Sequence, residues 1–441
     1  MDFYDTRVIK SVSTAIILDN GEIREVSNNF SSGAAVRVLS GGTWGFVSLD
    51  NPDDTESAIR SAKRLAEAAQ NKSPRNPVSL APIDKPKLRN LPKVREKPED
   101  IPVEDKVNLL FEIEKNTRID GIKSTSVVYS ESEATISYSN SEGLDCEYSV
   151  TRVGFAVSAV AQSEGSYQIG RESRFGVMGY EIFKKHDAFE LARKAAKTAV
   201  DLLSASAPKA GTYPVILDQE LAGVFIHEAV GHAVEADHVI EGNSILSGRI
   251  GEQIASPLIN VYDDPSYHGY GYYPFDAEGA ESAKTALIEN GVLKSFLHSR
   301  ETAAILGGKS RNSRAQGYSR PVIRMSNTFI GNGEMKFDEM LSELKDGIYL
   351  KGSRGGQVNP GEGVFQFNAE RGFIVKNGEI TTPLRDVSLS GNTLEILNNV
   401  KAVGNDLEMN SGRCGKAGQA VPVSDGSPHV LVGRAVVGGS G

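Results

Sequence analysis

The prolines of this chain are concentrated in one segment, and that segment limits what can form there. Seven of the 18 prolines lie between residues 74 and 102, interleaved with lysine, arginine and glutamate. Proline lacks a backbone N–H, breaks helices and is excluded from central strands. We therefore predict an extended surface connector at residues 74–102, with regular structure on either side of it.

The length of the chain predicts more than one domain. It has 441 residues, whereas single domains usually hold about 50 to 250 residues. The most plausible boundary is the segment 204–211, which follows an Ala/Leu-rich helical run. We expect an N-terminal α+β domain of residues 1–205 and a C-terminal, mainly antiparallel β domain of residues 206–441.

Hydrophobic periodicity assigns elements to both halves. Alternating and β-branched residues predict strands at residues 13–18, 35–39 and 212–217, and an antiparallel sheet over 125–162. Apolar residues at helical spacing predict helices at residues 55–71, 104–118, 189–203 and 221–238. Asp187 and Glu190 form a capping-box pattern before the third helix, and Asp218 is a good start for the fourth. The pattern indicates an α+β fold, in which an N-terminal antiparallel sheet with helices precedes a mainly antiparallel β domain.

Charge, cysteine content and hydropathy exclude several classes of protein. The net charge of -9 and the pI near 5.5 argue against a general nucleic-acid-binding protein, which needs a basic face. The N-terminus has no apolar core of signal-peptide length, and no stretch approaches a membrane span. We therefore expect a cytoplasmic protein without membrane contact. Cys146 and Cys414 do not suggest a disulfide framework.

The predicted helix 221–238 carries His227, Glu228 and His232 in the order His-Glu-Ala-Val-Gly-His. Two histidines that bracket a glutamate on a helix are typical of zinc metallopeptidases. The familiar spacing of four residues places the rings about 40° apart, whereas the five-residue spacing here places them about 140° apart. We therefore predict a π-bulge that brings both rings to one face, and Gly231 tolerates the distorted backbone.

Glu228 separates two interpretations of this helix. The histidines could be ordinary core or surface residues of an Ala/Val-rich helix. A carboxylate among the apolar residues 224–226 and 229–230 is costly to bury unless it is paired or catalytic. We prefer the interpretation in which Glu228 is the general base that accepts a proton from a zinc-activated water molecule.

Zinc needs a third protein ligand, and the spacing leaves its identity open. The candidates are Glu235, Asp237, His238 and Cys414. The two acids could equally accept a histidine N–H or face solvent. Cys414 lies in a glycine-flanked segment with two cations that favour the thiolate. The simpler interpretation is a small, buried, apolar cysteine.

Segments over nearly the whole chain resemble one family. They are GAAVRVLSGGTWGF (33–46), HEAVGHAVEAD (227–237), DAEG (276–279), LIENGVL (287–293), RMSNT (324–328), LKGSRGGQVN (350–359), GNDL (404–407) and CGKAGQAV (414–421). In them the chain resembles the TldD/PmbA family, and specifically its TldD-type metallopeptidase branch. The HExxxH and CGKxGQ segments are the specific ones, because PmbA-type members are expected to lack them.

The resemblance implies a complete metal site and a kind of reaction. Zinc would be bound by His227, His232 and Cys414, with Glu228 as the base. Family members are expected to cleave unstructured peptides inside an enclosed cavity, often as a heterodimer with a PmbA-type paralogue. This chain begins at the segment resembling Phe3–Arg7, without the helix that usually precedes it in the family. A homodimer therefore stays open as well.

Two further segments are candidate substrate contacts. The glycine-rich residues 352–361 could let a peptide backbone approach closely, although loops of this composition are more often only turns. Tyr270, Tyr272 or Tyr273 could stabilise an oxyanion, although aromatic residues in loops more often just pack. A peptide could also add as an extra strand to an exposed sheet edge.

Two other functions stay open. A cysteine peptidase could use Cys414, but no histidine lies near it in the sequence and Glu228 would have no role. A non-catalytic regulatory or assembly subunit is the other alternative, since the family has been described as a modulator of DNA gyrase. Against this alternative, the chain keeps every proposed ligand and the base.

Overall fold

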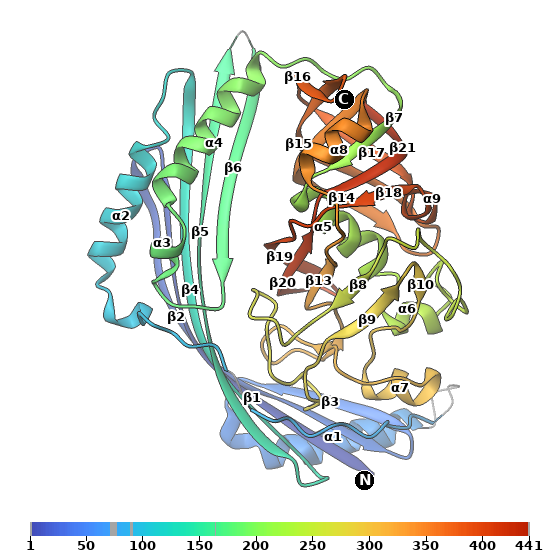
Figure 1. The fold of residues 1–441 in the computed structure, drawn as a ribbon. Helices are drawn as coiled ribbons and strands as arrows, with labels where there is room; N and C mark the ends of the chain where they lie inside the picture. Colours follow the sequence, from blue (N-terminus) through green and yellow to red (C-terminus); the bar gives the residue numbers. More distant parts are fainter. Residues whose placement is uncertain (1, 71–76, 89–90, 164, 440–441) are drawn as a thin grey trace.

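The structure, a computed structural model, describes residues 2–70, 77–88, 91–163 and 165–439. It has an antiparallel N-terminal sheet with helices, which lies beside a β-rich C-terminal part (Figure 1). The predicted α+β fold class is confirmed. The division of the chain at residues 205 and 206 stays a prediction. No described helix is both long and apolar enough to cross a membrane.

The strands of the N-terminal sheet are unusually long. They lie in the order β3-β2-β1-β4-β5-β6, with antiparallel neighbours throughout. Their bounds are β1 Phe3–Asp19, β2 Glu22–Ser40, β3 Thr43–Leu49, β4 Ile122–Asn140, β5 Asp145–Ser163 and β6 Ser166–Gly176. Asn20 and Gly21 join β1 to β2 with φ values of 52° and 77°, as a two-residue hairpin requires. The predicted strands 13–18 and 35–39 are only parts of β1 and β2.

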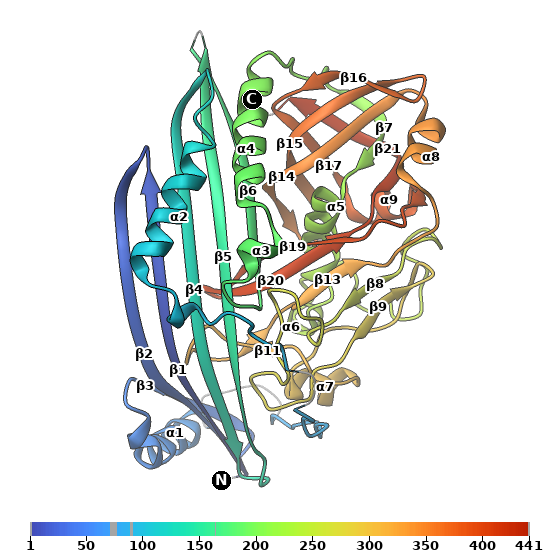
Figure 2. The ribbon, with the colours of Figure 1, turned by 60° about the vertical axis from the view of Figure 1, so that its left-hand side comes forward.

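Helices cover one face of this sheet (Figure 2). They are α1 Thr55–Gln70, α2 Val103–Lys115, α3 Ile182–Lys185 and α4 Ala188–Leu203, with short 3-10 turns at Pro52–Asp54 and Pro98–Asp100. Leu110 of α2 and Ala192 of α4 share a core with Phe155 of β5. As predicted, Asp187 caps α4, because its side chain accepts hydrogen bonds from two N–H groups of the first turn. Asn71, the last residue of the predicted first helix, lies outside the described residues.

The proline-rich connector runs without helix or strand over its described residues 77–88 and 91–97. This agrees with the predicted extended segment up to the 3-10 turn Pro98–Asp100. Residues 74–76, 89 and 90 lie outside the described residues.

The C-terminal part is built on two sheets. One has the order β10-β9-β8-β13-β20-β19, and the other has the order β14-β7-β21-β17-β15-β16, with β18 paired to β21. The first uses β8 Val261–Asp263, β9 Thr285–Glu289, β10 Val292–Leu293, β13 Asn327–Ile330, β19 Glu408–Lys416 and β20 Gln419–Ser427. The second uses β7 Gly211–Leu217, β14 Gly347–Asn359, β15 Val364–Lys376, β16 Glu379–Leu384, β17 Val387–Asn392, β18 Val400–Val403 and β21 Val430–Gly439. Most pairings are antiparallel, while β13–β20 and β14–β7 are parallel.

Smaller elements complete this part. They are the strands β11 Ser313–Arg314 and β12 Val322–Ile323 and the helices α5 Gln219–Ile226, α6 Ala236–Ile240, α7 Arg300–Leu306, α8 Phe337–Leu344 and α9 Thr393–Asn398. Helix α5 lies between the two sheets and contributes to the largest apolar core. That core surrounds the segment that carries the histidines.

Two sequence predictions are wrong in detail. The single helix predicted over 221–238 is interrupted, because the helical path from α5 ends at Gly231 and a separate α6 begins at Ala236. The glycine-rich residues 352–361 are not a loop, since most of them belong to β14 and pair with β15. The register of β14 shifts between Ser353 and Gly356, so the glycines accommodate a bulge in the strand.

Candidate metal centre

Helix α5 places the first histidine inside the protein. Its N-cap residue, Asp218, is buried and accepts a hydrogen bond of 2.9 Å from the N–H of Leu221. Leu221, Phe225 and Ile226 are buried in the core between the sheets. Because the helix is anchored by both its cap and its apolar face, His227 at its end is buried as well.

The helix widens where the histidine spacing requires it. Residues His227–Gly231 form a π-helical segment directly after α5. The extra residue per turn lets His232 return to the side of His227, and their ring centroids lie 5.5 Å apart. The predicted π-bulge at Gly231 is therefore confirmed.

Strand β19 brings a thiol to the two histidines. Cys414 is buried, and its Sγ lies 3.7 Å from His232 Nε2. Ligand atoms of His227, His232 and Cys414 all lie within 4.8 Å of one another. The second cysteine, Cys146, is on β5, where burial raises its pKa to about 12. The structure thus brings together the three residues that the family resemblance implied.

A buried arginine holds the backbone of the cysteine strand. Arg324 has no exposed surface, and its guanidinium donates hydrogen bonds to the carbonyls of Cys414, Lys416 and Gln419. These carbonyls lie on both sides of the tight turn between β19 and β20. Arg324 therefore fixes the position of Cys414 relative to the core. The sequence analysis assigned no role to this arginine, although it begins the RMSNT segment.

The two acids after the motif bind a lysine. Glu235 is fully buried, and its Oε2 lies 3.1 Å from His232 Nδ1. Lys416 donates to the same oxygen over 2.9 Å and to Asp237 over 2.7 and 2.9 Å. Glu235, Asp237 and His238 also have donor atoms close together, but the Lys416 ammonium already binds both carboxylates. Their placement suits the orientation of His232 rather than direct metal binding.

The cluster favours a thiolate. Burial raises the pKa of Cys414, but hydrogen bonds and the charges of His227 and His232 outweigh it, so that the pKa falls to about 5. Burial likewise raises the pKa of Glu235, but His232 and Lys416 bring it below its ordinary value. An anionic sulfur beside two imidazoles is a donor set that zinc takes in proteins.

Glu228 lies at the outer side of the cluster. Its Oε2 is 3.7 Å from His232 Nε2, and 29% of its side chain is exposed. Its apolar neighbours do not enclose this carboxylate, because the helix turns it toward solvent while Ala229 and Val230 face the core. Glu228 can therefore meet both water and the cluster.

A second carboxylate near the cluster has no signal in the sequence. Asp425 on β20 is buried against α5, where a Cβ at Gly223 would lie 3.0 Å from its Oδ1. Burial raises its pKa, His227 lowers it and Glu228 raises it, with a result of about 7. A lone aspartate near the end of a strand has no spacing that links it to a histidine about 200 residues earlier.

The tyrosines singled out in the sequence lie between the N-terminal sheet and the C-terminal part. Tyr273 donates its hydroxyl to the carbonyl of Arg311 over 2.7 Å. Tyr270 packs against Phe175 of β6 with ring centroids 5.6 Å apart, and Tyr272 is buried. An oxyanion-stabilising role for any of them stays a prediction.

Comparison with known proteins places this cluster in a family. Three family models match, described as the PmbA/TldA metallopeptidase domain 1 at residues 4–69, the central domain at residues 96–203 and the C-terminal domain at residues 210–439. Together they span most of the chain. The chain belongs to the PmbA/TldD family. The cluster of two histidines and one cysteine lies in the region matched by the family's C-terminal domain.

Curated relatives in the PmbA/TldD family are named as metalloproteases. A metalloprotease of Methanothermobacter thermautotrophicus is 43% identical, with 100% of this chain and 96% of the relative covered. A zinc metalloprotease TldD homolog of Saccharolobus solfataricus is 32% identical, with 99% and 96% covered. These names support a metallopeptidase family and, in one relative, zinc.

Solved structures show the same fold. A Thermotoga maritima protein, described as a candidate modulator of a DNA gyrase, has a TM-score of 0.82 at 22% identity and covers 99% of this chain and 96% of its own. TldE from Thermococcus kodakarensis has a TM-score of 0.79 at 21% identity, with 100% and 97% covered. At these identities the likeness describes the PmbA/TldD fold alone.

Proposed function

We propose that this protein is a zinc-dependent peptidase that hydrolyses unstructured peptides. The observation that carries the proposal is the convergence of His227, His232 and Cys414, whose donor atoms lie within 4.8 Å of one another although they come from distant parts of the chain. Two imidazoles and a thiolate fit zinc and leave one position of a tetrahedral site open, which a purely structural site does not. Zinc bound there would activate a water molecule and polarise the scissile carbonyl.

Glu228 is the proposed general base. Its carboxylate is near His232 and is partly exposed, so it can accept a proton from water and pass it to the leaving amine. Glu235 accepts from His232 Nδ1 and holds that ring in place. Lys416 neutralises Glu235 and thereby keeps it from competing for the metal.

The edge of the sheet supports an extended substrate. Among the described strands, β19 pairs only with β20 and so has one free edge. A peptide in extended form could add to that edge through main-chain hydrogen bonds, which demand little of its sequence. Such a peptide would pass the strand that carries Cys414.

The partner of this chain belongs to the same proposal. We expect either a homodimer or a heterodimer with a PmbA-type paralogue, and the likeness to a TldE structure supports the second kind of partner. A cytoplasmic location without direct nucleic-acid binding agrees with the acidic charge of the chain.

Metal analysis tests the proposed function. Purified wild type is expected to hold about one zinc per chain and to cleave a casein-derived peptide mixture, and chelation is expected to stop cleavage until zinc is restored. The Cys414→Ser variant is expected to lose both metal and activity, whereas the matched Cys146→Ser variant keeps both. Cleavage that survives complete zinc removal would contradict the proposal.

The structure makes the cysteine-peptidase alternative worth testing in the same experiment. Cys414 lies beside two histidines, which sequence distance alone did not reveal. Its thiol is nevertheless buried, whereas a nucleophile must reach the substrate carbonyl. Activity of the zinc-free protein that disappears on thiol alkylation would support this alternative.

A further inference from the structure

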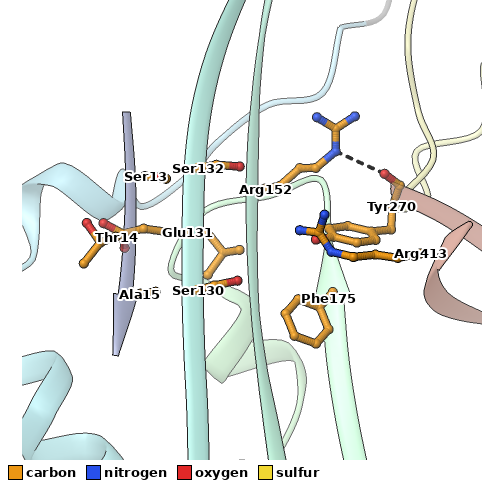
Figure 3. A pocket seen from close by; sticks show the side chains of 11 residues that line it. Ser13, Thr14, Ala15, Ser130, Glu131, Ser132, Arg152, Phe175, Tyr270 and Arg413 are labelled. Atoms are coloured by element: carbon orange, nitrogen blue, oxygen red, sulfur yellow. Dashed lines mark hydrogen bonds between the residues drawn. The ribbon is translucent and has the colours of Figure 1, made fainter. Parts of the chain in front are cut away.

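A cavity separates the N-terminal sheet from strand β19 (Figure 3). It has a volume of about 200 Å³. Its wall on the sheet side is polar and includes Ser13, Ser130 and Ser132. The opposite wall carries Tyr270 and Arg413, and Phe175 closes the lower side. The cavity is large enough for one acidic side chain or the end of a peptide.

Two arginines in this cavity have no carboxylate partner. Arg152 donates to the carbonyls of Tyr270 and Tyr272 over 3.1 and 2.8 Å. Arg413 is exposed, and within the described part of the chain its guanidinium makes no hydrogen bond or ion pair. Burial lowers the pKa of Arg152, and the charges of Arg314 and Arg413 lower it further. The cations therefore repel one another across the cavity.

The acid in the cavity wall is already neutralised. Glu131 belongs to the lining, but its side chain points away from the two arginines (Figure 3). It binds Lys106 of α2 over 2.8 Å and accepts from the Tyr129 hydroxyl on the helix-covered face of the sheet. The positive charge of the cavity thus stays uncompensated.

A neighbouring arginine adds to this charge. Arg314, whose charge acts on Arg152, donates to the carbonyls of Met325 and Pro422 and lies against the Tyr273 ring. Carbonyl groups satisfy the N–H donors of an arginine but do not cancel its charge. In a chain with a net charge of -9, a group of cations without an ion-paired carboxylate marks a place suited to an anion.

The cavity lies next to the candidate metal centre. Arg413 directly precedes Cys414 in β19, and successive residues of a strand point to opposite sides. Cys414 therefore faces α5 and the histidines, while Arg413 faces the cavity. A peptide along the free edge of β19 would turn alternate side chains toward these two sides.

We propose that this cavity binds a carboxylate of the peptide substrate through Arg413, with Arg152 adding charge. The inference rests on the proposed function, because it assigns the cavity to the same substrate. The carboxylate is either an acidic side chain close to the scissile bond or the C-terminus of the peptide. Phe175 and Tyr270 offer apolar walls for the methylene groups of a glutamate.

Binding of matched peptides tests the proposal. The probes are unstructured octapeptides of alanine, serine and glycine with an uncharged N-terminal fluorophore. Each peptide carries a single glutamate at a different position. Its neutral control has glutamine at the same position. These peptides have amidated C-termini, and one additional glutamine peptide with a free C-terminus tests the second source of the carboxylate. Fluorescence anisotropy is measured on zinc-loaded Glu228→Gln protein, so that cleavage does not interfere.

The expected result is a preference for one carboxylate-bearing peptide of about tenfold over its neutral counterpart, which is the usual scale for a charge-assisted hydrogen bond. Arg413→Gln is expected to abolish the preference. Arg434→Gln, at another exposed arginine on β21, is expected to keep it. In the protein that keeps Arg413, added salt should weaken the preference for the carboxylate-bearing peptide.

Two outcomes would overturn the inference. One is equal affinity for all charged and neutral peptides, and the other is a preference that survives Arg413→Gln. This binding test can fail independently of the proposed hydrolysis, because binding is measured without turnover. If the protein prefers the carboxylate peptide but never cleaves peptides, only the hydrolysis proposal is contradicted. If it cleaves peptides with zinc but shows no preference, only the cavity proposal is contradicted.

Discussion

The Cα of Gly231 lies against the side chain of Met325: a Cβ at residue 231 would come within 1.9 Å of Met325 Sδ. Glycine is therefore required at the end of the π-helical segment for space, whereas its φ is not positive and does not itself demand glycine. The methionine precedes β13 in the same core and has no exposed surface. The position of His232 depends on this contact, because it is the next residue.

We predict that Gly231→Ala lowers the free energy of unfolding by about 1 to 3 kcal/mol, as expected for overpacking, and reduces zinc content. Chemical denaturation and metal analysis measure the two effects. A second change, Met325→Ala, should restore part of the zinc binding by making room for the new methyl group. Gly415→Ala is the matched control, since a Cβ there meets no atom within 4 Å. Equal effects of Gly231→Ala and Gly415→Ala would contradict the prediction.

Lys416→Met is predicted to be strongly destabilising. The change leaves Glu235 fully buried without its cation, and removing one member of a buried pair costs about 3 to 5 kcal/mol. Zinc affinity should also fall by about 10- to 100-fold, because Glu235 orients His232.

Lys197→Met provides the comparison for Lys416→Met. Lys197 and Asp201 also lie 2.8 Å apart, but both side chains are exposed, so the loss should be no more than about 1 kcal/mol. Thermal or urea unfolding of both variants measures the difference. A loss of similar size in the two variants would show that the buried pair of Lys416 and Glu235 contributes no more to stability than the exposed pair of Lys197 and Asp201.

Glu228→Gln separates a peptidase from a regulatory subunit. The variant is expected to bind zinc as the wild type does and to lose about 10²- to 10⁴-fold in turnover, the usual contribution of a general base. Metal analysis and peptide cleavage measure the two properties. If the zinc-loaded variant kept its full biological effect in cells, the non-catalytic role would be favoured.

His298 predicts a pH dependence of stability. It is buried, and burial lowers its pKa from 6.5 to about 4. In the unfolded chain the His298 imidazole becomes protonated near pH 6.5, whereas in the folded protein it becomes protonated only near pH 4. The free energy of unfolding therefore decreases as the pH falls through this interval. The loss can reach about 3 kcal/mol.

The His298→Gln variant tests this pH dependence. Its free energy of unfolding, measured by urea titration at pH 7 and at pH 4.5, should fall less between the two values than that of the wild type. The comparison uses the change with pH, so a constant loss of stability in the variant does not affect it. Parallel pH profiles would rule out His298 as the cause.

The helix that carries His227 and His232 shows how much of the site the sequence predicts. The five-residue spacing between His227 and His232 requires a widened helix turn, and the π-helical segment follows that requirement. The end of the helix after Gly231 was not predictable, because Ala233 and Val234 continue the apolar pattern and are buried in the same core. Hydrophobic periodicity indicates which residues are buried and not where a helix ends. Here the residues after the helix are buried as well, so the periodicity continues past its end.

The third metal-binding candidate and its supporting contacts depend on long-range pairing. Cys414 and His232 are separated by 182 residues, and spacing alone left four candidates for the ligand. Only the family resemblance selected Cys414. The strands were underestimated for a different reason: polar residues such as Lys10 and Asn29 interrupt the apolar alternation of β1 and β2, although hydrogen bonding continues through them.

The order of His227 and Cys414 along the chain has a consequence for the timing of the proposed activity. During translation the segment with His227 and Glu228 leaves the ribosome well before β19, and early segments of a chain begin to fold first. Until β19 and β20 join their sheet, the histidines lack the thiol and the cluster is incomplete. The proposed peptidase would thus stay inactive toward other nascent polypeptides until the strand that carries Cys414 has been made and has joined its sheet.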